Sequence, residues 1–321
     1  MFWARFIVLV MSRPCSDYLD DVIKRDCRFK VLDHGFVRVV DYMGTDQAIV
    51  QAARVSYGAG TKNLRADEGL IRYLLRHRHT TPFEMCELKL HVKMPIFVAR
   101  QWIRHRTANV NEYSGRYSVM SEEFYLPDET WLMDSLRRQK DELKKTDDLF
   151  APQGVLATTA EQSQQNKQGR GALLSEKEAF AFLDKIRKAS KASYRVYRKL
   201  LGDGSTTALA RELARIVLPL NMYTEWYWKC DVHNLLHFLA LRLHPHAQYE
   251  IRVYAEAIYQ IMSGWLPMTA KAFADYRLEG VSLSKGQKEA LQSLLKGETP
   301  DYEALGLSER EKDELGKQFM L

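Results

Sequence analysis

Along the chain, the pattern of hydrophobic and polar positions changes between a period of two and a helical period. Residues 87–94 give the clearest strand, because apolar side chains alternate there with Glu, Lys and His. Two shorter runs rich in β-branched and aromatic residues predict strands at 29–32 and 36–41. Helical periods predict helices at residues 47–56, 66–77, 176–201, 207–217, 222–230, 232–243 and 245–265. Since helices outnumber strands, we expect an α+β fold with one small, mostly antiparallel sheet packed against several helices.

Capping signals place the starts of several helices. Thr45 and Asp46 precede the first of them. Its candidate packing positions are Ile49, Ala52, Ala53 and Val55. A serine followed three positions later by Glu or Gln predicts capping boxes at Ser175, Ser284 and Ser308. The last two predict short helices in the C-terminal part of the chain.

Changes in composition divide the chain into a central domain with an insertion, an N-terminal extension and a C-terminal extension. Residues 1–28 carry no strong pattern and are interpreted as an N-terminal extension, and residues 271–321 as a helical C-terminal extension. The central domain, 29–270, changes character at about 127–175. Within that region, residues 158–171 (TTAEQSQQNKQGRG) have little to bury. They predict a mobile insertion, or a segment that orders against a partner subunit.

Composition and charge narrow the class of ligand. The 321 residues are 46% hydrophobic and 27% charged, which is ordinary for a globular protein. The net charge of +6 and the pI near 9.0 favour anionic ligands. Because lysines and arginines are spread along the chain, they favour a nucleotide at least as readily as a nucleic acid polymer. No zinc-finger spacing or RNP-like motif is present, and we expect no polymer partner.

The cysteines and the N-terminal residues indicate where in the cell the protein is located. The four cysteines form no CxxC pair, so we expect free thiols in a reducing compartment. The opening MFWARFIVLVM is about half the length that spans a bilayer, and no small-residue cleavage site follows it. We therefore expect a cytoplasmic protein that is not bound to a membrane, with translation starting at Met1 or Met11.

Residues 101–118 (QWIRHRTANVNEYSGRYS) concentrate the candidate chemistry. The apolar run in front of them predicts a buried helix that places Gln101, Arg104 and His105 on one face. Further on, Ser114-Gly115 predicts a tight turn with available backbone N–H groups. An arginine-rich helix followed by such a turn suits an anionic, planar ligand such as a nucleotide.

This segment closely resembles the RHR-x7-S motif of the flavin-dependent thymidylate synthases, the ThyX family. Arg104-His105-Arg106 is followed after seven residues by Ser114, and the match extends through Asn111-Glu112 and Arg116-Tyr117. The likeness covers roughly residues 29–265, apart from the insertion. It implies a ThyX-like fold and a homotetramer whose sites lie at subunit interfaces. It also implies reductive methylation of dUMP to dTMP, with bound FAD and with NADPH and methylenetetrahydrofolate as co-substrates.

The resemblance assigns roles to single residues. It implies dUMP contacts from Gln101, Arg104, Glu112, Tyr113, Ser114, Gly115, Arg116, Arg215 and Arg242. It implies FAD contacts from Ser56, Thr81, Arg104, His105, Arg106, Glu112, Asp231, Val232, His233 and His237. His79 resembles the histidine that stacks against the folate, and Arg242 resembles the catalytic arginine that acts on the pyrimidine.

Arg242 also stands out without the resemblance. It lies on an otherwise apolar predicted helix, where a charge is costly unless it meets a ligand or a partner. The alternative is an arginine that pairs with a carboxylate or reaches solvent along its stem.

Other chemistries are open from the residues alone. Four histidines, His233, His237, His244 and His246, could bind zinc. However, Asn234 stands where an HExxH hydrolase has glutamate, and we expect no metal. The same arginines could also bind RNA phosphates without catalysis.

Thiol and Rossmann chemistry are not favoured. Cys86 and Cys230 adjoin apolar segments and are interpreted as core residues rather than as activated nucleophiles. Neither 58–60 (GAG) nor 202–204 (GDG) lies in a strand–GxGxxG–helix context. If a flavin binds, a different architecture must hold it.

Overall fold

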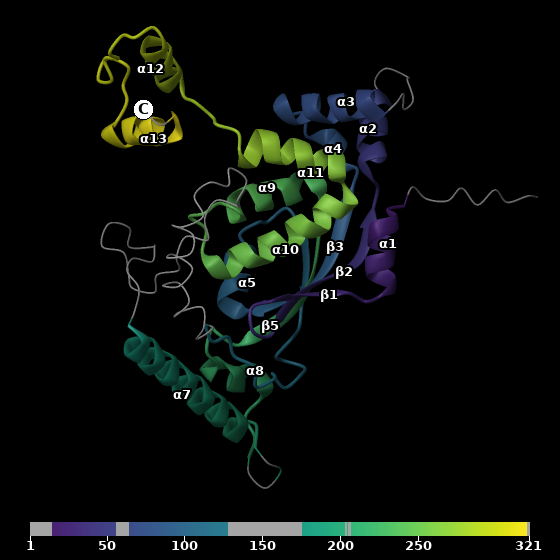
Figure 1. Ribbon diagram of the computed structural model, residues 1–321. Coiled ribbons are helices and arrows are strands. Elements are labelled where there is room, and N and C mark those ends of the chain that lie inside the picture. The colour runs from purple at the N-terminus through teal and green to yellow at the C-terminus, as the bar shows by residue number, and fades with distance from the viewer. Residues whose placement is uncertain (1–14, 56–63, 128–174, 203, 205–206, 320–321) are drawn as a thin grey trace, which may run out of the picture. The chain divides into compact units, whose positions relative to one another are not determined.

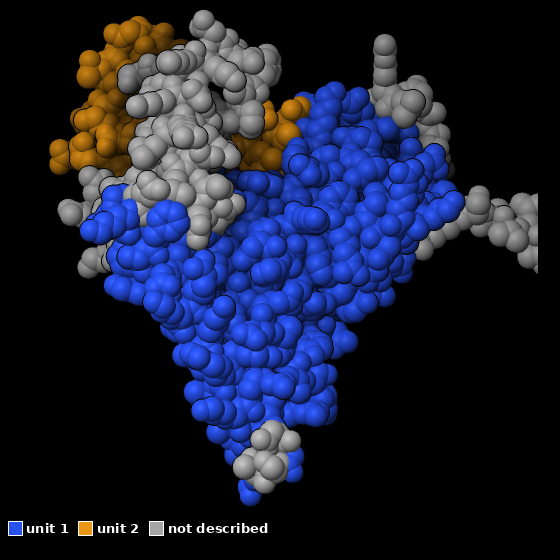
Figure 2. All heavy atoms as spheres, turned by 60° about the horizontal axis from the view of Figure 1, so that its bottom comes forward, with its two compact units in different colours: residues 1–271 blue, residues 272–321 orange. Residues whose placement is uncertain are grey.

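The computed structural model describes residues 15–55, 64–127, 175–202, 204 and 207–319. The chain divides into two compact units, Met1–Lys271 and Ala272–Leu321, which Figure 2 colours separately. The stretch 158–171 lies outside the described residues, and so does Ser56.

Unit 1 is built around one antiparallel sheet with the strand order β1-β2-β3-β5-β4 (Figure 1). Its strands are β1 (Arg28–Val31), β2 (Gly35–Met43), β3 (Glu87–Pro95), β4 (Asn109–Glu112) and β5 (Tyr223–Asp231). In the central strand β3, Leu90 pairs with Val39 of β2 on one side and with Trp228 of β5 on the other. The predicted α+β class and small antiparallel sheet are confirmed.

Strand β5 contradicts the helix predicted at 222–230. Trp226 and Trp228 are buried on its inner face, whereas Tyr227 lies on the outer face and is partly exposed. Tyr227 stacks on His91 of β3, with 5.0 Å between the ring centroids. Because an aromatic residue also occupies the outer face, the alternation between the two faces is hidden in the sequence.

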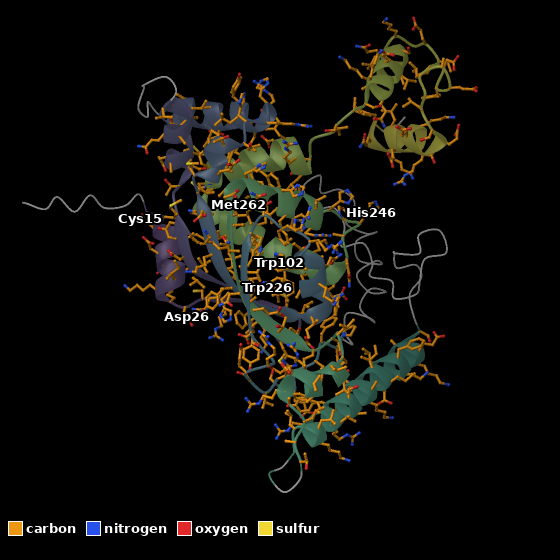
Figure 3. The ribbon with its side chains drawn as sticks, turned by 180° about the vertical axis from the view of Figure 1, so that it is seen from behind. Cys15, Asp26, Trp102, Trp226, His246 and Met262 are labelled. Carbon is orange, nitrogen blue, oxygen red and sulfur yellow. The ribbon has the colours of Figure 1, made fainter. Side chains whose placement is uncertain are left out.

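Helices cover the inner face of the sheet (Figure 1). These are α5 (Ile96–Trp102), α9 (Val232–Arg242) and α10 (Tyr249–Trp265). Their buried side chains meet at Trp102, whose ring stacks on Phe238 with 4.7 Å between centroids. Trp102 also lies edge-on to Trp226 at 5.8 Å, and Figure 3 shows these two side chains next to each other. This aromatic cluster fixes α5 and α9, which both carry candidate site residues.

The described N-terminal residues of unit 1 form α1 (Asp17–Lys24), α2 (Asp46–Arg54), α3 (Leu64–Arg76) and α4 (Thr81–Glu84). The sequence does not predict α1, which lies in the proposed extension and packs on β2 and α10 through its buried residues Leu19 and Val22. In α2, Ile49 and Val50 are buried. Val55 follows the last turn and is 79% exposed, so the prediction that it packs is wrong.

Helix α7 (Glu176–Leu200) lies where the sequence predicts it, and the capping box of Ser175 is confirmed. The helix predicted at 207–217 shortens to α8 (Arg211–Ala214) and the 3-10 turn η2 (Arg215–Val217). α7 packs against η2 through a small hydrophobic cluster of Met120, Tyr194, Tyr197, Ala214 and Met222. This cluster holds the segment that follows β4 against α7.

Helix α11 (Pro267–Phe273) spans the boundary between the units, and the π-helical turn Ala274–Leu278 follows it. Beyond it, unit 2 contains α12 (Lys285–Leu295) and α13 (Glu309–Phe319). Ser284 forms its predicted capping box, and Ser308 exchanges the expected hydrogen bonds with Glu311. Within the described parts of the chain, no helix is both long enough and apolar enough to cross a membrane.

Candidate functional site

The arginine-rich motif begins at the end of α5. Ile103 N still donates to Ala99 O, but His105 N donates to Trp102 O at 2.9 Å, so the chain leaves the helix. The prediction that Gln101, Arg104 and His105 share a helix face is therefore wrong, because only Gln101 lies on α5. The chain turns at this point to enter β4, which pairs with β5.

His105 contacts Arg242 directly. Arg242 Nε at the end of α9 donates to His105 Nε2 at 3.0 Å. The His105 ring also lies edge-on to His237 and to the buried Phe238, with centroid distances of 5.8 Å and 5.0 Å. Residues 238 and 242 are four apart on α9, so one helix face carries both contacts.

Burial, together with the smaller effects of the nearby Arg242 and His237, lowers the pKa of His105 to about 4. The imidazole is therefore neutral at neutral pH. The pKa of Arg242 is also lowered by burial, although arginine keeps its charge under ordinary conditions. Among the described residues, no carboxylate lies within ion-pair distance of Arg242. The described residues therefore do not support the alternative in which Arg242 pairs with a carboxylate.

Several predicted flavin contacts lie near this pair in the fold. Arg104 and Arg106 flank His105, and both are exposed. Thr81 begins α4, which packs against α9. We call the residues at this place the α9 group: Gln101, Arg104, His105, Arg106, His237 and Arg242.

The start of α9 carries three further predicted flavin contacts. Asp231 caps the helix, with Oδ1 accepting from Asn234 N at 2.9 Å. Val232 is fully buried and its N–H donates to Cys86 O, so its side chain and amide are directed into the protein. His233 is half-buried on the first turn.

A second set of predicted residues gathers after β4. Glu112 Oε1 accepts a hydrogen bond from the buried Thr224 hydroxyl of β5 at 2.8 Å. Ser114 O accepts from Tyr117 N and Ser118 N, which forms the predicted turn. Ser114 Oγ accepts from Arg116 N at 3.3 Å. We call this set the turn group: Glu112, Tyr113, Ser114, Gly115, Arg116 and Arg215.

Arg215 reaches the turn from η2. A Cβ added to the buried Gly115 would lie 3.5 Å from Arg215 Cδ and 3.0 Å from Met120 Sδ, so a side chain at this position would crowd both. Arg211, one helical turn earlier, donates from Nη1 to Tyr117 O at 2.6 Å. Neither Arg211 nor Thr224 is among the residues predicted from the sequence. The spacing of four residues between Arg211 and Arg215 is the only sequence signal that points to Arg211.

The two groups lie on different elements. In Figure 1, α8 lies beside α7 at the far side of β5 from α9. No hydrogen bond or ion pair between described residues joins the α9 group to the turn group. The predicted dUMP contacts are therefore divided between two places in the chain, and neither group contains all of them.

His79, the predicted folate contact, is exposed at the end of α3. Arg78 has a φ of 59°, a left-handed conformation that turns the chain out of the helix. The His79 ring stacks on the ring of Tyr73 at 5.7 Å with an angle of 16° between the planes. The histidine therefore presents a flat aromatic face whose orientation is set by α3.

The residues present fit an anionic dinucleotide and a uracil. Arg104 and Arg106 are exposed guanidinium groups without an ion pair among the described residues, which suits a diphosphate. Gln101 Oε1 is buried and has no hydrogen-bond partner in the described part of the chain. A buried carbonyl oxygen of this kind is costly unless a ligand donates to it.

The geometry gives less support to a cysteine nucleophile or a zinc site. Cys86 and Cys230 are buried, as expected, and burial raises the pKa of the Cys86 thiol to about 12. The pKa of the Cys230 thiol is also raised by burial. Among the described residues, no three His, Cys, Asp or Glu side chains come together as a metal site. His237 turns instead toward His105.

Comparison with known proteins agrees with the motif. The sequence model of the family described as Thymidylate synthase complementing protein matches residues 38–268. The flavin-dependent thymidylate synthase of Ruegeria pomeroyi is 55% identical over 88% of this chain and 84% of its own length. The enzyme of the same name from Gluconobacter oxydans is 54% identical over 95% of this chain and 90% of its own length.

A solved structure resembles the fold. The UMP/dUMP methylase PolB from Streptomyces cacaoi, bound with 5-Br dUMP, superposes with a TM-score of 0.63 and is 30% identical. The match covers 78% of this chain and 98% of that one.

Proposed function

Because this chain belongs to the family of flavin-dependent thymidylate synthases, we propose that it methylates dUMP to dTMP with methylenetetrahydrofolate and NADPH. The observation that carries the proposal is Arg242, a half-buried cation that is held by a neutral imidazole and has no carboxylate partner among the described residues. Such a cation stabilises negative charge that develops on a ligand.

The exposed arginines of the α9 group, together with Thr81 and the start of α9, would hold FAD. When bound, FAD carries reducing equivalents from NADPH to the one-carbon unit and completes the methyl group. The chain's own residues bind and orient the reactants. His79 offers its ring to the folate.

The turn group would bind the nucleotide phosphate. Arg116 and Arg215 bring two guanidinium groups to the turn, and arginine forks pair well with phosphate oxygens. Ser114 then acts as a binding hydroxyl at the turn rather than as a nucleophile, because no base bonds to its Oγ among the described residues. Arg242 and Gln101 would meet the uracil ring at the other end of dUMP.

We propose that one site takes the α9 group from one subunit and the turn group from another, within a homotetramer. The separation of the groups in the chain supports this. Exposed apolar side chains also lie close to both groups in the sequence: Ile216, 73% exposed, follows Arg215, Leu220, 57% exposed, lies five residues beyond Arg215, and Leu241 precedes Arg242. Large exposed apolar residues at two such places are typical of surfaces that a partner covers.

Mixing two inactive variants tests this arrangement. Arg215→Ala removes a member of the turn group, and Arg242→Ala removes a member of the α9 group. If subunits share sites, mixed oligomers contain sites with both groups intact, and activity recovers to roughly a quarter of the wild-type level for random pairing. Each variant refolded alone is the control. Absence of recovery, with subunit exchange shown by mass spectrometry of differently tagged chains, would place both groups in one subunit's site.

The four cysteines and the nucleotide substrate also support a cytoplasmic location. Cys15 is exposed and unpaired in the described structure, as expected in a reducing compartment.

A further inference from the structure

The contact between His105 and Arg242 has a defined polarity. Arg242 Nε can only donate, so His105 Nε2 must accept. The proton of the neutral imidazole then lies on Nδ1. A lowered pKa keeps this neutral form at neutral pH.

Two features hold the His105 ring in this orientation. Its edge packs on Phe238, which is fully buried and stacks on Trp102 of α5. The turn bond from His105 N to Trp102 O fixes the backbone beneath the ring. The imidazole is therefore set by the core and not by the arginine that it contacts.

A neutral acceptor differs from a carboxylate in its effect on the arginine. An aspartate or glutamate at this distance would orient the guanidinium but would also cancel much of its positive charge. A neutral imidazole orients the guanidinium by accepting from Arg242 Nε, and it leaves the positive charge of the guanidinium uncompensated. Among the described residues no bond uses Nη1 or Nη2 of Arg242, so both terminal groups can meet a planar ligand.

We propose that His105 is a positioning residue for Arg242: its Nε2 anchors the guanidinium and aims the two terminal N–H groups at the uracil of dUMP without neutralising them. This rests on the proposed function, and it adds to the flavin contact that the motif assigns to His105. The Nδ1–H on the opposite side of the ring has no partner among the described residues and is left for that contact.

Two substitutions separate the hydrogen bond from the shape of the ring. In His105→Gln, Oε1 can take the place of Nε2 as acceptor. In His105→Phe the ring and its packing on Phe238 are kept, but the acceptor is lost. His34→Phe, on an exposed turn outside both groups, controls for replacement of a histidine by an aromatic ring.

The variants are compared as full-length, FAD-loaded protein by dUMP calorimetry and by turnover. For His105→Phe we expect about tenfold weaker dUMP binding, the equivalent of one lost hydrogen bond. We expect kcat to fall on the order of 10²-fold, because a misplaced catalytic group costs more in the transition state. His105→Gln should restore most of both.

A double-mutant cycle identifies the route of the effect. On an Arg242→Ala background, His105→Phe should change dUMP binding and kcat by less than about twofold, since the residue that it positions is already absent. An equal loss on both backgrounds would show that His105 acts through the cofactor and would overturn the proposal. Wild-type behaviour of His105→Phe would overturn it as well.

A spectroscopic readout separates this proposal from the proposed function. ¹⁵N NMR of histidine-labelled protein at neutral pH should show His105 as the neutral Nδ1–H tautomer, assigned by its loss in His105→Gln, and Arg242→Ala should shift its Nε2 resonance. A protonated ring or an Nε2–H tautomer would refute the anchoring bond even in an active enzyme. If the tautomer is as expected but no dTMP forms, the proposed function fails and the bond stands.

Discussion

At the scale of single side chains, the proposed chemistry depends on how the protein stabilises a half-buried positive charge. Arg242 lies on an apolar helix, and a neutral histidine is the partner that contacts it. Burial strengthens its field at a ligand, because little water screens the charge. Because the side chain is half-buried, the hydrogen bond to His105 also determines how the guanidinium group is oriented.

Replacing Arg242 tests the role of this charge. Arg242→Ala should lower the rate of dTMP formation by about 10²–10³, or about 3–4 kcal/mol, the usual cost of one preorganised donor. Arg242→Lys should rescue poorly, because it keeps the charge but not the planar fork. Flavin uptake, followed by absorbance, should be unchanged in both variants. Near wild-type turnover by the alanine variant would make Arg242 structural.

The lowered pKa of His105 predicts a pH dependence of stability. Its folded-state pKa of about 4 lies below the ordinary value of 6.5, so the unfolded chain binds the extra proton more readily. The contribution is therefore fully present above about pH 6.5 and is lost as the pH falls toward 4. Arg242 and His237 face this ring, and both are still present in a variant at position 105.

Thermal melting of the wild type and of His105→Gln between pH 7.5 and 4 measures this effect, because glutamine does not titrate. The wild type should lose stability relative to the variant as the pH falls through this window. A difference in melting temperature that stays constant with pH would contradict the lowered pKa.

The spacing of residues in the sequence predicts the motif, but it does not predict which distant residues the motif contacts. Ser114 and Gly115 form the expected turn because they lie next to each other in the chain. His105 and Arg242 are 137 positions apart, and Thr224 and Glu112 are 112 apart. Contacts over such separations follow from the pairing of β4 with β5 and from the packing of α9, which local pattern does not specify.

At the scale of elements, α7 stabilises the segment that carries the turn group. Tyr194 Oη donates to Met120 O at 3.0 Å, and Tyr197 Oη accepts from Met120 N at 3.1 Å. Tyr197 is fully buried, and so are both bonds. A helix remote from the motif in sequence therefore fixes the backbone that follows Arg116.

Removing one hydroxyl tests this coupling. Tyr197→Phe leaves the buried Met120 N–H without an acceptor, which costs about 1–3 kcal/mol. We expect a lower midpoint of denaturation and weaker dUMP binding, with FAD uptake retained because the α9 group is untouched. Tyr302→Phe in unit 2 is the matched control. A loss of stability without any change in dUMP affinity would show that α7 does not position the turn.

The prediction of elements succeeded where one face is apolar and the other charged, as in β3, and where a cap marks the start, as in α7. It failed for β5, because Tyr227 places an aromatic ring on the outer face and removes the alternation. It missed α1, whose buried residues Leu19 and Val22 are too few to give a strong period. Both failures arise where tertiary packing, rather than local pattern, decides the structure.

At the scale of the whole molecule, the family match lies within unit 1. Residues 38–268 include most of β2, the whole of β3 to β5, and all the members of the α9 and turn groups. Unit 2 forms its own short capped helices beyond this match. The proposed chemistry therefore belongs to unit 1.

The formation of dTMP tests the account most directly. Full-length protein loaded with FAD is incubated with dUMP, methylenetetrahydrofolate and NADPH, and both the nucleotide and the folate products are measured by chromatography. We expect dTMP only when FAD and NADPH are present, with the folate released as tetrahydrofolate, because the reducing equivalents come from NADPH. No dTMP from flavin-loaded protein, or equal dTMP after the flavin or NADPH is removed, would contradict the account.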